Sequence, residues 1–236
     1  MQLTHPEINR SCQEEAIYEE MLALDGASIL ELGCGKANHT RKIAASHPNA
    51  TILAAEVDAT QHAKNLASER PANLRFADFG AQAIPLADAS IDIVMMFKSL
   101  HHVPGALLDQ ALGEICRVLK PGAYLYLSEP VFAGPFNDMV RVFNDEEAVR
   151  KAAFEAACRA VQTGLFRFCE EQFFLVPVHY RDFDEFEKAH FYATHSERHV
   201  SEAQRAEVER LFRQHLGPGG VHLSQQMRVD LLRKPS

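Results

Sequence analysis

Residues 29–37 read Ile29-Leu30-Glu31-Leu32-Gly33-Cys34-Gly35-Lys36-Ala37 and predict a buried strand, a glycine turn and the start of a helix. Gly33 permits a sharp turn because it has no Cβ to exclude positive φ. Gly35 lets a ligand come close to the backbone, and the free N–H groups of the helix expected over 38–46 point toward that ligand. This arrangement outlines a site for a nucleotide-containing cofactor, although many such turns bind nothing.

Two details narrow the choice of ligand. The dinucleotide-binding fingerprint has a third glycine three positions after the second, and this chain has Asn38 there. Glu31 also precedes the turn, where its carboxylate would repel a pyrophosphate and would suit a cationic amine. S-Adenosylmethionine carries an ammonium, a sulfonium and an adenosine but no phosphate, so we expect this cofactor rather than a nicotinamide dinucleotide.

The composition favours a single α/β domain that acts on a small molecule. A chain of 236 residues can bury a full core. Its formal net charge is −8, from 24 Lys and Arg against 32 Asp and Glu, which makes a large nucleic acid a disfavoured partner. The five cysteines form no CxxC pair, and their odd number favours reduced thiols and a cytoplasmic location. Neither a signal peptide nor a membrane span is expected, because no basic-then-apolar leader and no apolar run of about 20 residues occurs.

Strands and helices alternate through the first 130 residues. An amphipathic helix is predicted over 6–24, and five apolar runs then read as strands. The predicted strands are 28–32, 51–57, 73–79, 91–97 and 123–128, and the helices between them include 38–46, 59–69 and 108–119. This alternation specifies a mostly parallel, doubly wound sheet, in which ligands bind at the carboxyl ends of the strands.

Acidic residues stand at the ends of the second and third predicted strands. A carboxylate at the end of the second strand can bond both hydroxyls of a ribose, and we prefer Asp58 to Glu56 because Glu56 precedes the end of the strand. Asp58 can also be the acid at the N-terminus of the next helix, and the two roles can hold together. Asp78 suits the exocyclic amine of adenine and Phe79 suits a base face, with a turn-capping role as the alternative for Asp78.

The pattern changes in the second half of the chain. An alanine-rich helix is predicted over 149–161, with Asn144 and Glu147 as its capping pair. Further elements are expected as strands over 173–180 and 227–232, paired antiparallel at the sheet edge, and as helices over 182–192 and 201–215. The aromatic residues from Phe173 to Tyr192 either line an acceptor site or form the ordinary core of this region.

Taken together, these residues resemble the class I S-adenosylmethionine-dependent methyltransferases, in the small-domain branch that includes ubiquinone/menaquinone-type and many natural-product methyltransferases. The resemblance covers about residues 27–130. It rests on the stretches Glu31-Leu32-Gly33-Cys34-Gly35, Asp58, Asp78-Phe79, Ile91-Asp92-Ile93-Val94, Leu100-His101-His102-Val103 and Glu114-Ile115-Cys116-Arg117-Val118-Leu119-Lys120-Pro121-Gly122. The family implies a Rossmann-like methyltransferase fold, with a seven-stranded sheet whose last strand is antiparallel.

The resemblance also implies which residues bind the cofactor. They are Glu31, Gly33, Cys34 and Gly35 for the methionine part, Asp58 and Ala59 for the ribose, Asp78 and Phe79 for the adenine, and Phe97 and His102 for further contacts. One position departs from the family, which often has a third glycine where this chain has Ala37.

In methyl transfer the protein mainly aligns the nucleophile with the methyl group and excludes water. A general base is needed only for a nucleophile that keeps its proton, so the catalytic residue is left open. The candidates are His101, His102 and Glu129, and those for the acceptor site are Lys98, His101, Tyr192 and His195. His195 and His199 stand at i, i+4, but without an evident third ligand we predict no metal.

The sequence therefore predicts one methyltransferase domain over 1–236, with a cofactor-binding core over 27–130 and a helical lid from 1–26 and 131–200. We expect methyl transfer from S-adenosylmethionine to a small-molecule acceptor. A tRNA- or protein-directed methyltransferase and a non-catalytic S-adenosylmethionine-binding protein are the alternatives. The oligomeric state, monomer or homodimer, is left open.

Overall fold

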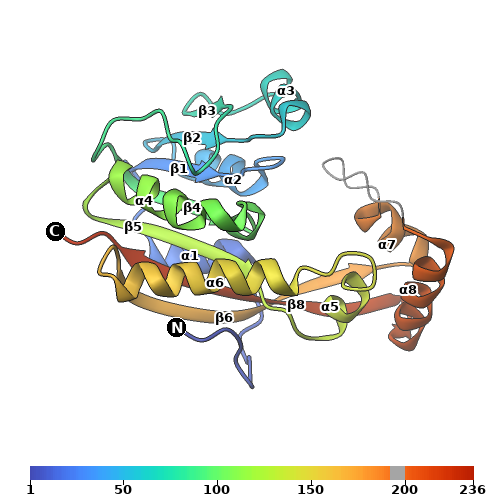
Figure 1. Cartoon of the computed structure of the whole chain (residues 1–236). Helices are drawn as coiled ribbons and strands as arrows, with labels where there is room; N and C mark the ends of the chain where they lie inside the picture. The colour runs from blue at the N-terminus through green and yellow to red at the C-terminus, as the bar shows by residue number, and fades with distance from the viewer. Residues whose placement is uncertain (192–199) are drawn as a thin grey trace.

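A single mixed β-sheet runs through the molecule, and helices cover both of its faces (Figure 1). The computed structural model describes residues 1–191 and 200–236. The strands are β1 (Ser28–Leu32), β2 (Thr51–Ala55), β3 (Leu74–Ala77), β4 (Ile91–Phe97), β5 (Leu119–Pro130), β6 (Arg167–Tyr180), β7 (Leu216–Gly217) and β8 (Gly220–Arg233). The helices are α1 (Glu14–Met21), α2 (Asn38–Ser46), α3 (Ala59–Ala67), α4 (Leu108–Val118), α5 (Pro135–Val140), α6 (Glu147–Gln162), α7 (Phe183–His190) and α8 (Glu202–Gln214), with the 3-10 turns η1 (Leu100–His102) and η2 (Gly105–Leu107). Among these described helices, none has the length and apolar character to cross a membrane.

The order of the strands across the sheet is β3-β2-β1-β4-β5-β8-β6, and the short strand β7 pairs with β8. Neighbours among β1 to β5 are parallel. β8 is antiparallel to β5, and β6 is antiparallel to β8. The expected doubly wound, seven-stranded sheet with its antiparallel last strand is confirmed, with β7 as a two-residue addition. The strand order reverses between β1 and β4, and in open α/β sheets a ligand binds at the carboxyl ends of the strands beside that reversal.

Each face of the sheet buries its own apolar core. Successive side chains of a strand point to opposite faces, so Leu30 packs in one core with Leu112 of α4 and Ala156 of α6. Ile29 packs in the other core with Ile17 of α1 and Ile43 of α2. Burial on both faces explains why the central strands are nearly continuous apolar runs.

A third apolar cluster lies where the far ends of β6 and β8 meet α5, α7 and α8 (Figure 1). Tyr180, Phe186, Phe191 and Phe212 are buried in it. For Tyr180, Phe186 and Phe191 this burial favours the interpretation as ordinary core over that of an acceptor-site lining. Tyr192 lies outside the described residues.

Several element boundaries differ from those expected. α1 begins at Glu14 rather than near residue 6, and β6 begins at Arg167 rather than at Phe173. The first part of β6 is rich in charged, exposed residues, which is common at the edge of a sheet and hides a strand from pattern reading. The segments expected to form the lid, 1–26 and 131–200, contain α1, α5, α6 and α7, whereas β6 belongs to the sheet.

The expected capping pair of α6 is wrong. The residue at the N-cap is Glu146, and its side chain makes no capping hydrogen bond. The side-chain amide of Asn144 instead donates to Glu146 Oε1 at 2.8 Å. The backbone amide of Glu147 donates to Asp145 Oδ1 at 3.1 Å. The side chain of Glu146 therefore caps no backbone amide of α6 and instead accepts from Arg150 in the first turn of the helix.

The edge of the sheet formed by β6 is partly covered by the N-terminal segment. The Cys12 amide donates to the Leu175 carbonyl at 3.0 Å, and the Leu175 amide donates to the Arg10 carbonyl at 2.8 Å. These bonds attach residues 10–12 to β6 as a short parallel bridge.

Candidate functional site

The glycine turn after β1 forms a corner of bare backbone. Gly33 and Gly35 have φ of +69° and +52°. A Cβ on Gly33 would lie 2.7 Å from Ser99 Cβ, and Ser99 Oγ holds that position by donating to the Leu32 carbonyl at 2.7 Å. A Cβ on Gly35 would meet nothing within 4 Å, so the backbone there faces open space. Ala37, at the position of the absent third glycine, takes the left-handed conformation with φ of +55°.

Glu31 is buried beside this corner, in the middle of the sheet. It stands in register with Ala54 of β2 and Met95 of β4, and it is 3% exposed. Its Oε2 has no hydrogen-bond partner among the described residues. Burial, together with the negative charge of Glu56, raises the pKa of Glu31 to about 8. A buried carboxylate oxygen without a donor is costly, and a cationic group at the corner would relieve that cost.

The second carboxylate at the corner is Glu56, whereas the sequence led us to prefer Asp58. Glu56 is buried directly after β2, and its Oε2 accepts from the Gly35 amide at 2.7 Å. Asp58 is the N-cap of α3 and accepts from the Thr60 amide at 2.8 Å. Its carboxylate is thus engaged by the helix, as in the alternative stated above, and Ala59 is the exposed first residue of that helix.

The remaining predicted cofactor residues follow β1, β3 and β4. Cys34 is buried, with its amide donating to the Ala55 carbonyl at 2.9 Å. Asp78 is exposed directly after β3, and Phe79 packs partly buried against the core that contains α4. The Phe97 ring is stacked on His39, with centroids 4.4 Å apart, so only its backbone is available to a ligand.

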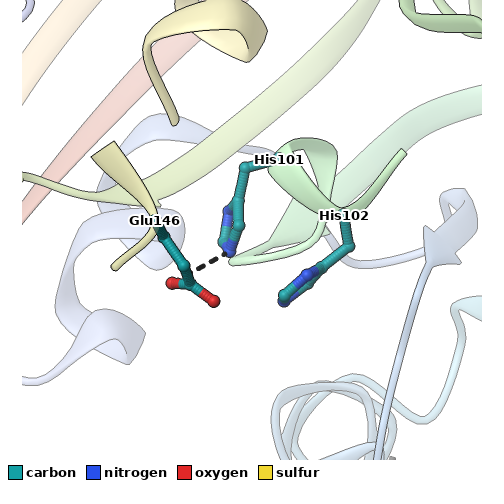
Figure 2. Close-up of side chains that lie close together, drawn as sticks. All are labelled: His101, His102 and Glu146. Carbon is teal, nitrogen blue, oxygen red and sulfur yellow. Dashed lines mark ion pairs between the residues drawn. The ribbon is translucent and has the colours of Figure 1, made fainter. Parts of the chain in front are cut away.

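A chain of polar contacts links β5 to the turn after β4. Glu129 at the end of β5 accepts from the Leu100 amide at 2.9 Å through Oε1, and its Oε2 contacts His101 Nδ1. His101 is buried, and its Nε2 lies 3.7 Å from Glu146 Oε2. Figure 2 shows His101 and Glu146 pointing toward each other, with His102 from the same turn beside them. Glu129 therefore contacts both the backbone and the ring of the turn that carries His101.

These side chains include a potential metal-ligand set. Ligand atoms of His101, His102 and Glu146 lie within 4.8 Å of one another, and two histidines with a carboxylate are a familiar set for zinc or iron. However, Arg150 Nη2 lies 2.7 Å from Glu146 Oε2, and its positive charge opposes a dication there. Although burial opposes ionisation, the hydrogen bond from Asn144 and the charges of His101 and Arg150 hold the pKa of Glu146 below its ordinary value.

A cavity of about 190 Å³ opens next to this cluster, between the ends of β4 and β5 and the helices α5 and α6. Lys98 lines it, as predicted for an acceptor-site residue, whereas His101 does not belong to its wall. The predicted acceptor residues Tyr192 and His195, and the pair His195 and His199, lie outside the described residues.

Among the cavity residues that sequence reasoning missed, Glu146 and Arg150 are the charged ones. They stand far along the chain from Lys98 and reach the cavity wall only through the path of α5 and α6. The run Asp145-Glu146-Glu147 before an alanine-rich helix was the available signal, but it does not indicate which acid faces inward.

Comparison with known proteins finds a methyltransferase domain over residues 29–122, the part that holds the glycine corner. The malonyl-[acyl-carrier protein] O-methyltransferase of Methylococcus capsulatus is 35% identical over 104 residues, which are 43% of this chain and 37% of that protein. The ubiquinone/menaquinone biosynthesis C-methyltransferase of Hahella chejuensis is 32% identical over 120 residues, 49% of this chain and 47% of that protein. This chain thus spans less than half the length of these curated relatives. The YcgJ protein of Bacillus subtilis shares the fold, with a TM-score of 0.61 at 16% identity over 94% of this chain and 97% of that one.

Proposed function

We propose that this chain, whose residues 29–122 match a methyltransferase domain, is a class I, S-adenosylmethionine-dependent methyltransferase that transfers a methyl group to a small-molecule acceptor. The relatives that carry O- and C-methyltransferase names support this activity. The five cysteines are all free thiols, which supports a reducing compartment such as the cytoplasm.

The observation that carries the proposal is the pairing of Glu31 with the bare corner at Gly35. The Glu31 oxygen that lacks a donor among the described residues fits the ammonium of S-adenosylmethionine. The open space at Gly35 fits the close approach of its methionine part. A diphosphate in the same place would meet Glu56, and also Glu31 wherever its carboxyl is ionised, and like charges at short range would disfavour it.

We assign the other contacts in keeping with the positions of the side chains. Glu56, rather than Asp58, bonds the ribose hydroxyls. Asp78 bonds the adenine amine and Phe79 covers the base, while Cys34 and the backbone at Phe97 border the methionine part. When bound, S-adenosylmethionine supplies a methyl group already activated by its positive sulfur. The chain's own task is to align the acceptor and exclude water, which supplies up to about 7–11 kcal/mol in model reactions.

Binding measurements test the cofactor assignment first. We expect calorimetry to show that the protein binds S-adenosylhomocysteine and that it binds neither NAD nor NADP. Incubation of the protein and a methyl-labelled cofactor with metabolite extracts should then label a small molecule. Binding of a dinucleotide in place of S-adenosylhomocysteine would refute the cofactor assignment. Cofactor binding without labelling of any metabolite, nucleic acid or protein fraction would favour a non-catalytic binding protein.

Affinity for S-adenosylhomocysteine is expected to increase with pH up to about 8. The raised pKa of Glu31 keeps its carboxyl protonated below that pH, while a bound ammonium requires the carboxylate. Binding below pH 8 must therefore release a proton, and affinity should rise by up to about tenfold per pH unit. Calorimetry in buffers of different ionisation enthalpy measures this release. A pH-independent affinity between about pH 6 and 8 would contradict the contact.

The helical part of the lid is expected to close over bound cofactor. The helix α5 and the first turn of α6 form one wall of the cavity, and elements beside a binding site tend to have low local stability. Hydrogen exchange should show their amides exchanging faster than those of β1 and β4, and slowing when S-adenosylhomocysteine binds. Equal protection of α5 and α6 with and without the ligand would refute the lid.

A further inference from the structure

The wall of the cavity beside His101 and Glu146 combines polar and apolar residues. Lys98 and Arg150 bring positive charge to this wall. Gln225 and Gln226 add neutral amide side chains. The apolar part comes from Phe136 and Val140 of α5, with Val131 and Ala133 from the segment before it. Pockets that bind small molecules commonly combine an apolar wall with a few polar groups that fix orientation.

Lys98 is held in this wall by an unusual backbone conformation. Its φ is +54°, a left-handed conformation that costs a non-glycine residue roughly 1–2 kcal/mol. The amide of Lys98 donates to the Ser128 carbonyl of β5 at 2.7 Å, and the next residue, Ser99, packs against Gly33. The conformation thus fixes the start of the Lys98 side chain between the cofactor corner and the cavity.

The charge of Lys98 is not neutralised within the described residues. Its Nζ donates to Gln225 Oε1 at 3.2 Å, which is a neutral acceptor, and it forms no ion pair with any residue in 1–191 or 200–236. The other cation, Arg150, is paired with Glu146 at 2.7 Å. His190 adds no charge at neutral pH, because burial and the nearby Lys98 lower its pKa to about 4.

Lys98 is an exposed residue, so an anionic ligand can reach its ammonium. The protein packed around that ammonium lowers its pKa and Arg150 lowers it further, whereas Glu14 and Glu129 raise it. An anionic ligand would restore the favourable state of the ammonium. This positive wall lies in a protein of formal net charge −8, so it would draw an anion to one place on a surface that otherwise repels it.

We propose that this cavity binds an acceptor that carries one carboxylate on a compact apolar body, with Lys98 holding the carboxylate and Phe136 and Val140 contacting the body. The inference rests on the proposed function and specifies the substrate class of the same site. A single unmatched cation suits a monoanion, whereas a phosphate dianion would also face the carboxylate of Glu146. The small volume of about 190 Å³ suits a compact molecule. Because Ser99 joins Lys98 to the corner at Gly33, the bound acid would lie next to the cofactor.

The test uses benzoate as the probe and benzamide as its uncharged isostere. In titrations of the full chain saturated with S-adenosylhomocysteine, followed by ligand-observed NMR, benzoate should bind and benzamide should bind at least tenfold more weakly. Lys98→Met should lower benzoate affinity at least tenfold and leave benzamide unchanged within about twofold, in line with the loss of one charge-assisted hydrogen bond. Lys98→Arg should keep benzoate affinity within about threefold.

Two controls separate this result from other causes. Lys151→Met changes an exposed lysine of α6 that pairs with Glu155, and it should alter neither probe. Lys98→Met should bind S-adenosylhomocysteine with the affinity of the unchanged chain. Cofactor binding and benzoate binding are therefore measured separately, and either proposal can fail without the other. Equal binding of benzoate and benzamide, no binding of benzoate, or unchanged benzoate affinity in Lys98→Met would each overturn the proposal. If Lys98→Met loses methyl transfer but keeps benzoate affinity, Lys98 acts on a proton of the acceptor and the carboxylate site is wrong.

Discussion

Glu31→Gln is expected to weaken S-adenosylhomocysteine binding by roughly 30- to 150-fold. Glutamine keeps the size of the side chain but removes the charge that faces the ligand ammonium. The loss of a hydrogen bond between two charged groups in a buried site corresponds to about 2 to 3 kcal/mol. Calorimetry at about pH 8, where the carboxyl of the unchanged chain is about half ionised, tests this contrast.

The same substitution is expected to stabilise the ligand-free protein at alkaline pH. Because the folded-state pKa of Glu31, about 8, lies above its ordinary value of 4.5, the folded chain holds a proton that the unfolded chain releases. Stability from this group is therefore complete below pH 4.5 and is lost as the pH rises toward 8. Urea unfolding of the variant should lack this loss, so its free energy of unfolding should exceed that of the unchanged chain increasingly over this range.

Glu14→Gln is the matched control for Glu31→Gln. Glu14 is likewise buried, and burial raises the pKa of its carboxyl, but it bonds Tyr126 at 2.7 Å on the face covered by α1. It should leave S-adenosylhomocysteine affinity unchanged within about twofold. If Glu31→Gln binds as tightly as the unchanged chain, the ammonium does not sit at Glu31 and the proposed cofactor site is wrong.

Glu56→Ala and Asp58→Ala are expected to have opposite consequences. Glu56→Ala removes a buried carboxylate at the corner together with its bond from the Gly35 amide, and it should weaken S-adenosylhomocysteine binding at least tenfold, or by about 1.4 kcal/mol or more. Asp58→Ala removes the cap of α3 and should cost about 0.5–2 kcal/mol of stability, with binding unchanged within about threefold.

The two variants are compared by calorimetry for affinity and by urea unfolding for stability. Each serves as the control for the other, because both remove a carboxylate at the end of β2. The reverse ranking of affinities would return the ribose contact to Asp58, as first expected from the sequence.

The choice between these two acids shows where sequence reasoning succeeds and where it stops. The glycine corner, the acid before it and the parallel strands follow from local patterns, because each depends on a few consecutive residues such as Glu31, Gly33 and Gly35. The end of a strand depends on its neighbours: β2 stops at Ala55 because its register with β3 stops at Ala77. Asp58 then falls in the next helix as a cap, and Glu56 takes the place at the corner.

The acceptor side was less accessible to prediction. Lys98 could be named because it follows β4 directly, at the edge where ligands of such sheets bind. Glu146 and Arg150 could not, because their place in the cavity depends on how the segment after β5 folds back over it. The contacts involved join residues about 50 positions apart, and no local periodicity encodes such a distance.

The attachment of residues 10–12 to β6 bears on how copies of this protein meet one another in concentrated solution. An open edge strand offers unpaired amides and carbonyls on which a second chain can build. Here the backbone amide and carbonyl of Leu175 are already hydrogen-bonded to Arg10 and Cys12. The N-terminal part of β6 presents the exposed Glu170. A neighbouring molecule would have to strip off that segment or bring its own strand against a negative charge. The fold thereby disfavours the addition of further chains to the sheet at the edge formed by β6.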